Sequence, residues 1–186
     1  MAVEVATTRR RFTRAEYYRM AEAGILGEDD RVELIEGEIV QMSPPGNRHI
    51  AFVISLSNLL TLRLAGRALV STQNPVVLTD DTEPQPDVTV LRRRAYKDRR
   101  VSADDVALLI EVADTSLSYD RRTKLPLYAR AGIPEYWIVD CAAEAVEVYR
   151  NPSEDRYRDV SRFAAPAALR LQAFPDIELT LAEIFA

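Results

Sequence analysis

The sequence predicts a mixed α/β (α+β) fold, with a central mixed β-sheet flanked by helices. Between residues 48 and 140 the chain reads as a helix, three strands, a second helix and a further strand. Short apolar runs rich in β-branched residues are typical of strands, and an apolar period near 3.6 residues is typical of helices. Helices that alternate with strands in this way cover both faces of one sheet.

The first half of the chain begins with a capping-box pattern, in which Thr13 is followed three residues later by Glu16. The run VELIEGEIVQMS predicts two short strands about Gly37. The elements expected here are a helix through Ala23, two strands within 32–43, an amphipathic helix over Arg48–Leu64 whose inner face holds Ile50, Val53, Ile54, Leu56, Leu60 and Leu64, and a strand over Ala68–Leu78.

The second half is expected to contain a hairpin, a helix and several further strands. The helix is expected to begin after Thr123 as its N-cap, because Pro126 then falls in the first turn, where its missing N–H has no helical partner. The expected elements are strands Pro86–Leu91 and Val106–Val112 around the Arg92–Asp105 loop, the helix after Thr123, a strand over Ile133–Asp140 paired with Glu144–Arg150, strands near Arg156–Arg162 and Leu169–Leu171, and a short C-terminal helix capped by Thr180.

The two strands of the expected hairpin each carry one carboxylate in apolar sequence, Asp87 in the first and Glu111 in the second. If they pair antiparallel with Val90 opposite Leu108, Asp87 lies directly opposite Glu111, with Cβ atoms about 5 Å apart. Two carboxylates this close stay ionised only with a cation between them, which indicates a hard divalent metal with oxygen ligands. The pattern is equally consistent with two carboxylates at strand ends in water.

Length and composition indicate one globular domain. The chain has 186 residues, of which 47% are hydrophobic and 28% charged. Residues 1–11 lack periodicity and are expected to form a flexible arm, with residues 12–186 as a single domain. A lone cysteine, Cys141, excludes an intrachain disulfide, and no apolar run approaches the roughly 20 residues of a membrane span. We therefore expect a cytoplasmic protein that does not enter a membrane.

The net charge of −5 is unusual for a protein that binds nucleic acid along a basic face. The charges are uneven, however, because RRRAYKDRR at 92–100 gathers basic residues in the hairpin loop. Arg92, Arg93 and Arg94 are candidate contacts to a phosphate backbone beside the acidic pair. The alternative for such a charge run is a solvated face.

A family resemblance is carried by several of these motifs together. PD at 86–87, a glutamate in the next strand, and the run EVADTS…YDRRTK…Y…AGIPEYWIVD resemble the Uma-type family within the PD-(D/E)XK nuclease superfamily. The similarity extends from about Phe12 to the C-terminal strands. It implies a restriction-endonuclease-like core with extra N-terminal and C-terminal strands.

The resemblance also implies which residues act. The superfamily lysine stands two residues after the glutamate, where this chain has Ala113, whereas the Uma-type pattern carries a lysine further on that maps to Lys124. An N-terminal glutamate often joins the site in the resembling nucleases, and Glu36 is the candidate here, with a solvated turn residue as an equal alternative. Apart from the resemblance, His49 follows a Pro-Gly-Asn loop at a helix N-terminus, where backbone N–H groups favour anions, so it either touches a scissile phosphate or makes a local cap or surface contact. Residues expected to surround and orient the site are Gln73, Asp120 and Tyr128.

The function expected from these residues is Mg²⁺-dependent hydrolysis of DNA phosphodiester bonds, with Mn²⁺ as a possible substitute. Asp87, Glu111 and the carbonyl of Val112 would hold the ion, and Lys124 would orient the attacking water. The alternative is a catalytically inactive module that keeps the nuclease fold and binds nucleic acid or protein. A homodimer is expected, because cutting both strands of a duplex needs two active sites or a second binding event.

Overall fold

A computed structural model describes residues 9–27 and 29–186 of the chain. Most of the expected arm, residues 1–8, lies outside the described residues. The elements in chain order are α1 (Arg14–Glu22), β1 (Val32–Ile35), β2 (Glu38–Gln41), α2 (Asn47–Leu64), β3 (Ala68–Thr72), β4 (Val88–Arg92), β5 (Val106–Ala113), α3 (Leu117–Tyr119), α4 (Leu125–Arg130), β6 (Glu135–Asp140), β7 (Ala145–Ser153), β8 (Arg156–Ala164), β9 (Ala168–Leu171), β10 (Phe174–Thr180) and α5 (Leu181–Ile184).

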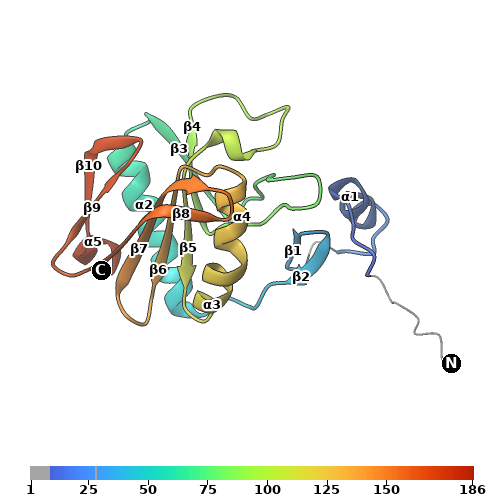
Figure 1. The fold of residues 1–186 in the computed structure, drawn as a ribbon, viewed down its shortest axis with the longest axis horizontal. Coiled ribbons are helices and arrows are strands. Elements are labelled where there is room, and N and C mark those ends of the chain that lie inside the picture. Colours follow the sequence, from blue (N-terminus) through green and yellow to red (C-terminus); the bar gives the residue numbers. More distant parts are fainter. Residues whose placement is uncertain (1–8, 28) are drawn as a thin grey trace.

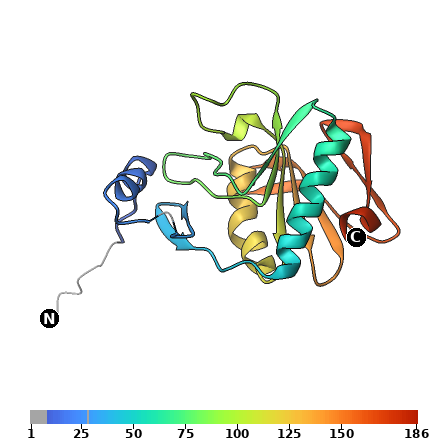
Figure 2. The same cartoon turned by 180° about the vertical axis from the view of Figure 1, so that it is seen from behind.

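The central sheet has six strands in the order β3-β4-β5-β6-β7-β8. Strands β5 and β6 are parallel, and the other neighbours are antiparallel. Helix α2 covers one face of this sheet and the α3–α4 segment covers the other (Figures 1 and 2). The predicted central mixed sheet flanked by helices is therefore confirmed. The extra N-terminal and C-terminal strands form two separate two-stranded sheets, β1-β2 and β9-β10.

The hydrophobic core is divided by the sheet into two layers. Leu56 and Leu60 of α2 pack with Val90 and Ile110 on one face, and the C-terminal elements join this layer. Tyr128 of α4 belongs to the layer on the other face. Since successive side chains of a strand point to opposite faces, β5 supplies both layers and is buried along its whole length.

Helix α2 matches its predicted range but not all of its predicted inner face. Val53, Leu56, Leu60 and Leu64 are buried, whereas Ile50 and Ile54 are 42% and 62% exposed. A helical residue turns by about 100°, so Ile54 points about 100° away from Val53 and leaves the buried stripe. The prediction that both isoleucines face the core was wrong.

Strand β3 ends at Thr72 instead of continuing to Leu78. Gln73 has a positive φ of 50°, a left-handed conformation that turns the chain out of the strand. Val76 N–H then donates to the carbonyl of Pro84, and Val77 forms a single bridge with Ser102. Strand β10 is a further difference, because no strand was predicted between Leu171 and Thr180.

The helical segment after β5 begins earlier than predicted, with Ser116 and not Thr123 as its N-cap. A π-helical turn, Asp120–Lys124, joins α3 to α4. In this turn the N–H of Leu125 donates to the carbonyl of Asp120, five residues back. The wider turn carries the chain into α4 with Pro126 in its first turn, so the proline does not break the segment.

The N-terminal elements lie at one side of the central sheet (Figure 1). The predicted capping box of Thr13 and Glu16 is present at α1, and β1 and β2 pair about Gly37 as predicted. Glu83 N–H donates to the carbonyl of Leu34 and ties β1 to the segment before β4. No helix within residues 9–27 and 29–186 is long and apolar enough to cross a membrane.

We predict that Gly37→Ala destabilises the protein more than Gly24→Ala does. Both glycines have positive φ, +76° and +70°, so both substitutions force an L-residue into the left-handed region at a cost of about 1–2 kcal/mol. A Cβ at Gly37 would also lie 2.5 Å from Cβ of Arg11, whereas a Cβ at Gly24 meets nothing within 4 Å. Urea unfolding should show the larger loss of free energy at Gly37, and equal losses would contradict the close approach.

Candidate active site

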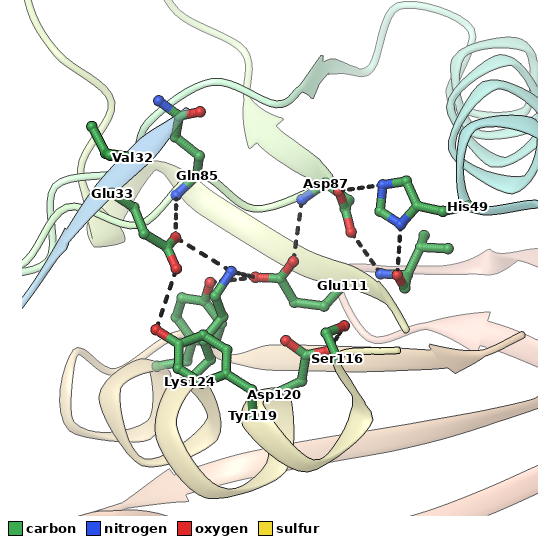
Figure 3. A network of polar contacts seen from close by, with 12 residues as sticks. Val32, Glu33, His49, Gln85, Asp87, Glu111, Ser116, Tyr119, Asp120 and Lys124 are labelled. Atoms are coloured by element: carbon green, nitrogen blue, oxygen red, sulfur yellow. Dashed lines mark hydrogen bonds and ion pairs between the residues drawn. The ribbon is translucent and has the colours of Figure 1, made fainter. Parts of the chain in front are cut away.

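The β4–β5 hairpin brings Asp87 and Glu111 together. Val90 lies opposite Leu108 and Val88 opposite Ile110, which is the predicted register. Asp87 N–H donates to Oε2 of Glu111 at 3.4 Å, and Val112 N–H donates to Oδ2 of Asp87 at 2.8 Å. The two carboxylates are only 9% and 3% exposed, so the alternative of two strand-end carboxylates in water does not hold. Figure 3 shows the Glu111 carboxylate beside the backbone nitrogen of Asp87.

Lys124 reaches the carboxylates from the π-helical turn on the neighbouring helical segment. Its Nζ lies 3.0 Å from Oε1 of Glu111 and 3.4 Å from Oε2 of Glu33 (Figure 3). The hydroxyl of Tyr128, one turn further along, donates to the same Oε1 of Glu111 at 2.6 Å. The structure therefore brings Asp87, Glu111, Lys124 and Tyr128 into one contact network.

The glutamate that joins this network from the N-terminal hairpin is Glu33. Glu36, the residue expected there, lies in the β1–β2 turn with φ of 48° and pairs with Arg130 at 2.6 Å, away from the cluster. Glu33 accepts hydrogen bonds from Gln85 N–H at 3.2 Å and from the hydroxyl of Tyr119 at 3.4 Å. A glutamate inside the apolar strand VELI was the available signal, because charged residues are seldom buried without a partner.

His49 lies between two oxygen atoms of the cluster. Its Nε2 is 3.1 Å from Oδ1 of Asp87, and its Nδ1 is 2.9 Å from the carbonyl oxygen of Val112. Both oxygens are acceptors, so contact with both favours the doubly protonated imidazolium. The hydrogen bond to Asp87 raises the pKa of His49, although partial burial opposes this rise. His49 therefore belongs to the cluster and is more than a local helix cap.

Two further residues expected near the site differ in their placement. Asp120 is buried at the edge of the cluster and accepts a hydrogen bond from the Ser116 hydroxyl at 2.6 Å. Burial raises the pKa of Asp120 to about 6, although Lys124 opposes the rise. Gln73 contributes only its backbone N–H, which donates to the carbonyl of Asp87 at 3.1 Å, while its side chain is exposed.

The cluster holds more carboxylates than cations, and this imbalance determines its pKa values. Burial raises the pKa of Glu111 to about 8, with Lys124 lowering it and the charges of Asp87 and Asp120 adding to the rise. Burial alone would lower the pKa of Lys124, but attraction to Glu111, Glu33 and Asp120 raises it above its ordinary value. Lys124 is therefore held as an ammonium among an excess of carboxylates.

The cluster lies at the base of a cleft of 530 Å³. One wall is formed by β2 and the loop that leads into α2, and the other by residues 114–124 after β5. The first wall belongs to the N-terminal elements and the second to the central fold. The cleft is therefore completed by docking of the β1–β2 hairpin against the central sheet.

The basic loop lies at the far end of the hairpin from this cleft, which corrects its expected position beside the acidic pair. Asp87 precedes β4 and Arg92 ends it, so about five residues at ~3.3 Å each separate the two. Arg94 pairs with the buried Asp105 at 2.9 Å, and Arg93 donates to the carbonyl of Gly66. These arginines hold the loop itself, and neither they nor Arg92 line the cleft.

The donor atoms of the cluster suit a magnesium ion with an incomplete protein shell. Within residues 9–27 and 29–186, no group of three or more acidic, histidine or cysteine side chains is arranged to enclose a metal. Mg²⁺ is commonly bound by one or two carboxylates together with waters and substrate phosphates, so Asp87 and Glu111 are the residues of the cluster that would hold it. The carbonyl of Val112, expected as a third ligand, is contacted by His49.

The protein has a mixed sheet with helices on both faces, and two buried carboxylates and a lysine lie at the base of its cleft. These features define a restriction-endonuclease-like α+β protein. A family model described as "Putative restriction endonuclease", Uma2, matches residues 14–182, and the chain belongs to this family. The fold is similar to a crystal structure described as a putative nuclease belonging to DUF820 from Anabaena variabilis ATCC 29413, with a TM-score of 0.72, 19% identity, and 94% of this chain and 97% of that chain covered. No match was found among curated proteins.

We predict that Glu111→Gln changes how stability depends on pH in metal-free buffer. The folded pKa of Glu111, about 8, exceeds its unfolded value of 4.5, so its contribution to stability is complete below pH 4.5 and is lost as pH rises to about 8. Relative to the unsubstituted protein, the variant should gain stability across this range, on the order of a few kcal/mol. Urea unfolding at several pH values measures the difference.

The control for this prediction is Glu38→Gln, which removes a carboxylate from an exposed position in β2. Its pH profile should follow that of the unsubstituted protein. A Glu111→Gln profile parallel to both would show that the carboxylate is not desolvated.

Proposed function

We propose that this protein is a Mg²⁺-dependent endonuclease that hydrolyses DNA phosphodiester bonds. The observation that carries the proposal is the buried cluster of Asp87, Glu111 and Lys124 at the base of a cleft. Phosphoryl transfer depends on positioning and on the stabilisation of charge, and this cluster offers both. Membership of the Uma2 family supports the same reaction class.

In this proposal Asp87 and Glu111 hold the ion. A bound Mg²⁺ supplies charge that polarises the phosphoryl oxygen and lowers the pKa of a water molecule. In hydrolysis, the oxygen of a water molecule would bond to phosphorus while one ester P–O bond breaks, the water would lose a proton to solvent, and the departing oxygen would take a proton from solvent to leave as a hydroxyl group. The hydrogen bond from Tyr128 fixes Glu111, and the contacts of His49 and Val112 N–H fix Asp87.

Lys124 acts as a cation in this reaction and not as a general base. Its neighbouring carboxylates raise the pKa of the ammonium, so it does not accept a proton at neutral pH. An ammonium beside the carboxylates can instead orient the water and offset the charge that develops on the phosphate. Its contact with Glu33 keeps it near Glu111 even when Glu111 binds another cation.

A binding module that keeps the nuclease fold is the second candidate. The observation in its favour is that every carboxylate oxygen of Asp87 and Glu111 already has a protein partner. A metal ion would have to replace one or more of these contacts. Whether the protein cuts DNA therefore decides between the two functions.

We predict that Lys124→Met lowers cleavage by at least about 100-fold while DNA binding remains, the scale expected for a group that acts mainly in the transition state. Methionine retains the apolar stem of the buried side chain, and circular dichroism would confirm folding. Nicking of supercoiled plasmid with Mg²⁺ or Mn²⁺ measures the rate. Lys97→Ala, a lysine exposed in the far loop, is the control with the same change in charge.

Full activity in Lys124→Met would show that the lysine has another role. Inactivity of the unsubstituted protein with every divalent ion, together with retained DNA binding, would instead support the binding module.

We also predict that Asp87→Asn lowers the affinity for Mn²⁺ by at least tenfold in calorimetry, because asparagine keeps the shape of the side chain but loses its charge. The fold should persist, since the amide oxygen can still accept from Val112 N–H. Asp104→Asn, in the far loop, serves as a control. Unchanged Mn²⁺ affinity in Asp87→Asn would exclude this residue as a ligand.

A further inference from the structure

The reactive groups lie deep in the molecule. Glu33, Asp87, Glu111 and Lys124 are each at most 9% exposed. The cleft above them, at 530 Å³, has the size of a small-molecule site, which is commonly 300–1,000 Å³. A scissile phosphate must therefore pass between the two walls to approach Lys124. A phosphate on an intact duplex is held on a rigid helix that brings the second strand with it.

The walls of the cleft offer surfaces for unpaired bases. Val40, Met42 and Pro45 supply apolar side chains on one wall, and the half-buried ring of Tyr119 lies on the other. The contacts of Glu33 with Gln85 and Tyr119 hold the two walls together. Apolar and aromatic surfaces bind the faces of single-stranded bases, which are stacked and inaccessible inside a duplex.

One cation in the cleft is available for a phosphate. Lys124 and His49 each contact carboxylates, whereas the half-buried Arg31, which precedes β1 and lines the cleft, forms no ion pair with any described residue. Arg48 at the start of α2 is paired with Asp114 at 3.0 Å. Proteins that bind duplexes often make 6–10 phosphate contacts, and the cleft provides far fewer basic side chains. The six basic residues of 92–100 are at the far end of the hairpin.

From these observations we propose that the cleft binds an unpaired, single-stranded segment of nucleic acid in preference to an intact duplex, and that Arg31 binds its backbone phosphate. This deepens the proposed function by naming its substrate class and rests on it. The strand enters between the β2 wall and Tyr119, with bases against the apolar surfaces. Its phosphate is thereby directed toward Lys124 at the base.

Fluorescence anisotropy with a 12-nucleotide single strand and with the same sequence as a blunt duplex tests the proposal. The cleavage-deficient Lys124→Met protein is used, with and without Mn²⁺, so that binding is read without turnover. The single strand should bind at least tenfold more tightly than the duplex. Its salt dependence should be shallow, with a slope corresponding to about one to three phosphates at roughly −0.7 for each.

Adding Arg31→Ala to the Lys124→Met protein should weaken its binding of the single strand about tenfold, since one charge-assisted contact is lost. The slope of log affinity against log salt concentration should fall in magnitude by roughly 0.7. Adding Arg31→Lys should keep most of the slope. Adding Arg92→Ala is the control, because it removes the same charge from the far end of the hairpin and should leave single-strand binding unchanged. Circular dichroism of each variant shows whether it is folded.

Equal or tighter binding of the duplex, no binding of either probe, or an Arg31→Ala protein that binds like Arg92→Ala would each overturn the inference. Failure of the proposed hydrolysis is a separate result. A protein that prefers the single strand through Arg31 but cuts no DNA with any divalent ion would uphold the inference and refute the nuclease.

Discussion

The arrangement of the whole site depends on one desolvated ammonium, that of Lys124, which Glu111 and Glu33 share. Glu111 belongs to the central sheet, Glu33 to the N-terminal hairpin and Lys124 to the helical segment, so the contact joins three separate parts of the chain. Burying any of these charges alone would be strongly unfavourable, and each is tolerated only through the others. Docking of the N-terminal hairpin and pairing of Lys124 therefore depend on one another.

The sequence alone was sufficient to predict that Asp87 and Glu111 meet in the central sheet. Asp87 stands directly before the apolar strand β4 and Glu111 interrupts β5, and the two-residue period of a strand fixes which side chains meet once one pair is chosen. The role of Glu33 in place of Glu36 was only partly foreseeable, because the glutamate inside VELI indicates a buried charge but not the partner that it meets. The β1–β2 hairpin forms its own two-stranded sheet, and its position over the cleft results from tertiary contacts such as Glu83 with Leu34, which leave no local pattern.

The helical segment before Ile133 shows a different limit. Thr123 and Pro126 are a reasonable start signal for a helix, yet helical structure begins at Leu117. Packing of Leu127, Tyr128 and Ala129 into the core stabilises the segment beyond what its local sequence indicates. The extra residue of the π-helical turn is part of this solution, and such turns are frequent at functional sites. Rules for helix N-caps use only local sequence, so they describe neither the stabilisation by core packing nor the π-helical turn.

The β4–β5 hairpin also contains a bulge, and it makes the register of the acidic pair independent of the length of the loop. Val90 faces Leu108, but Leu91 faces Val106, so one additional residue of β5 is accommodated between them. The bulge lies between the acidic pair and the loop. Insertions or deletions in the loop can thus be absorbed before they reach Asp87 and Glu111. A change in the length of the loop would therefore leave Asp87 and Glu111 in register.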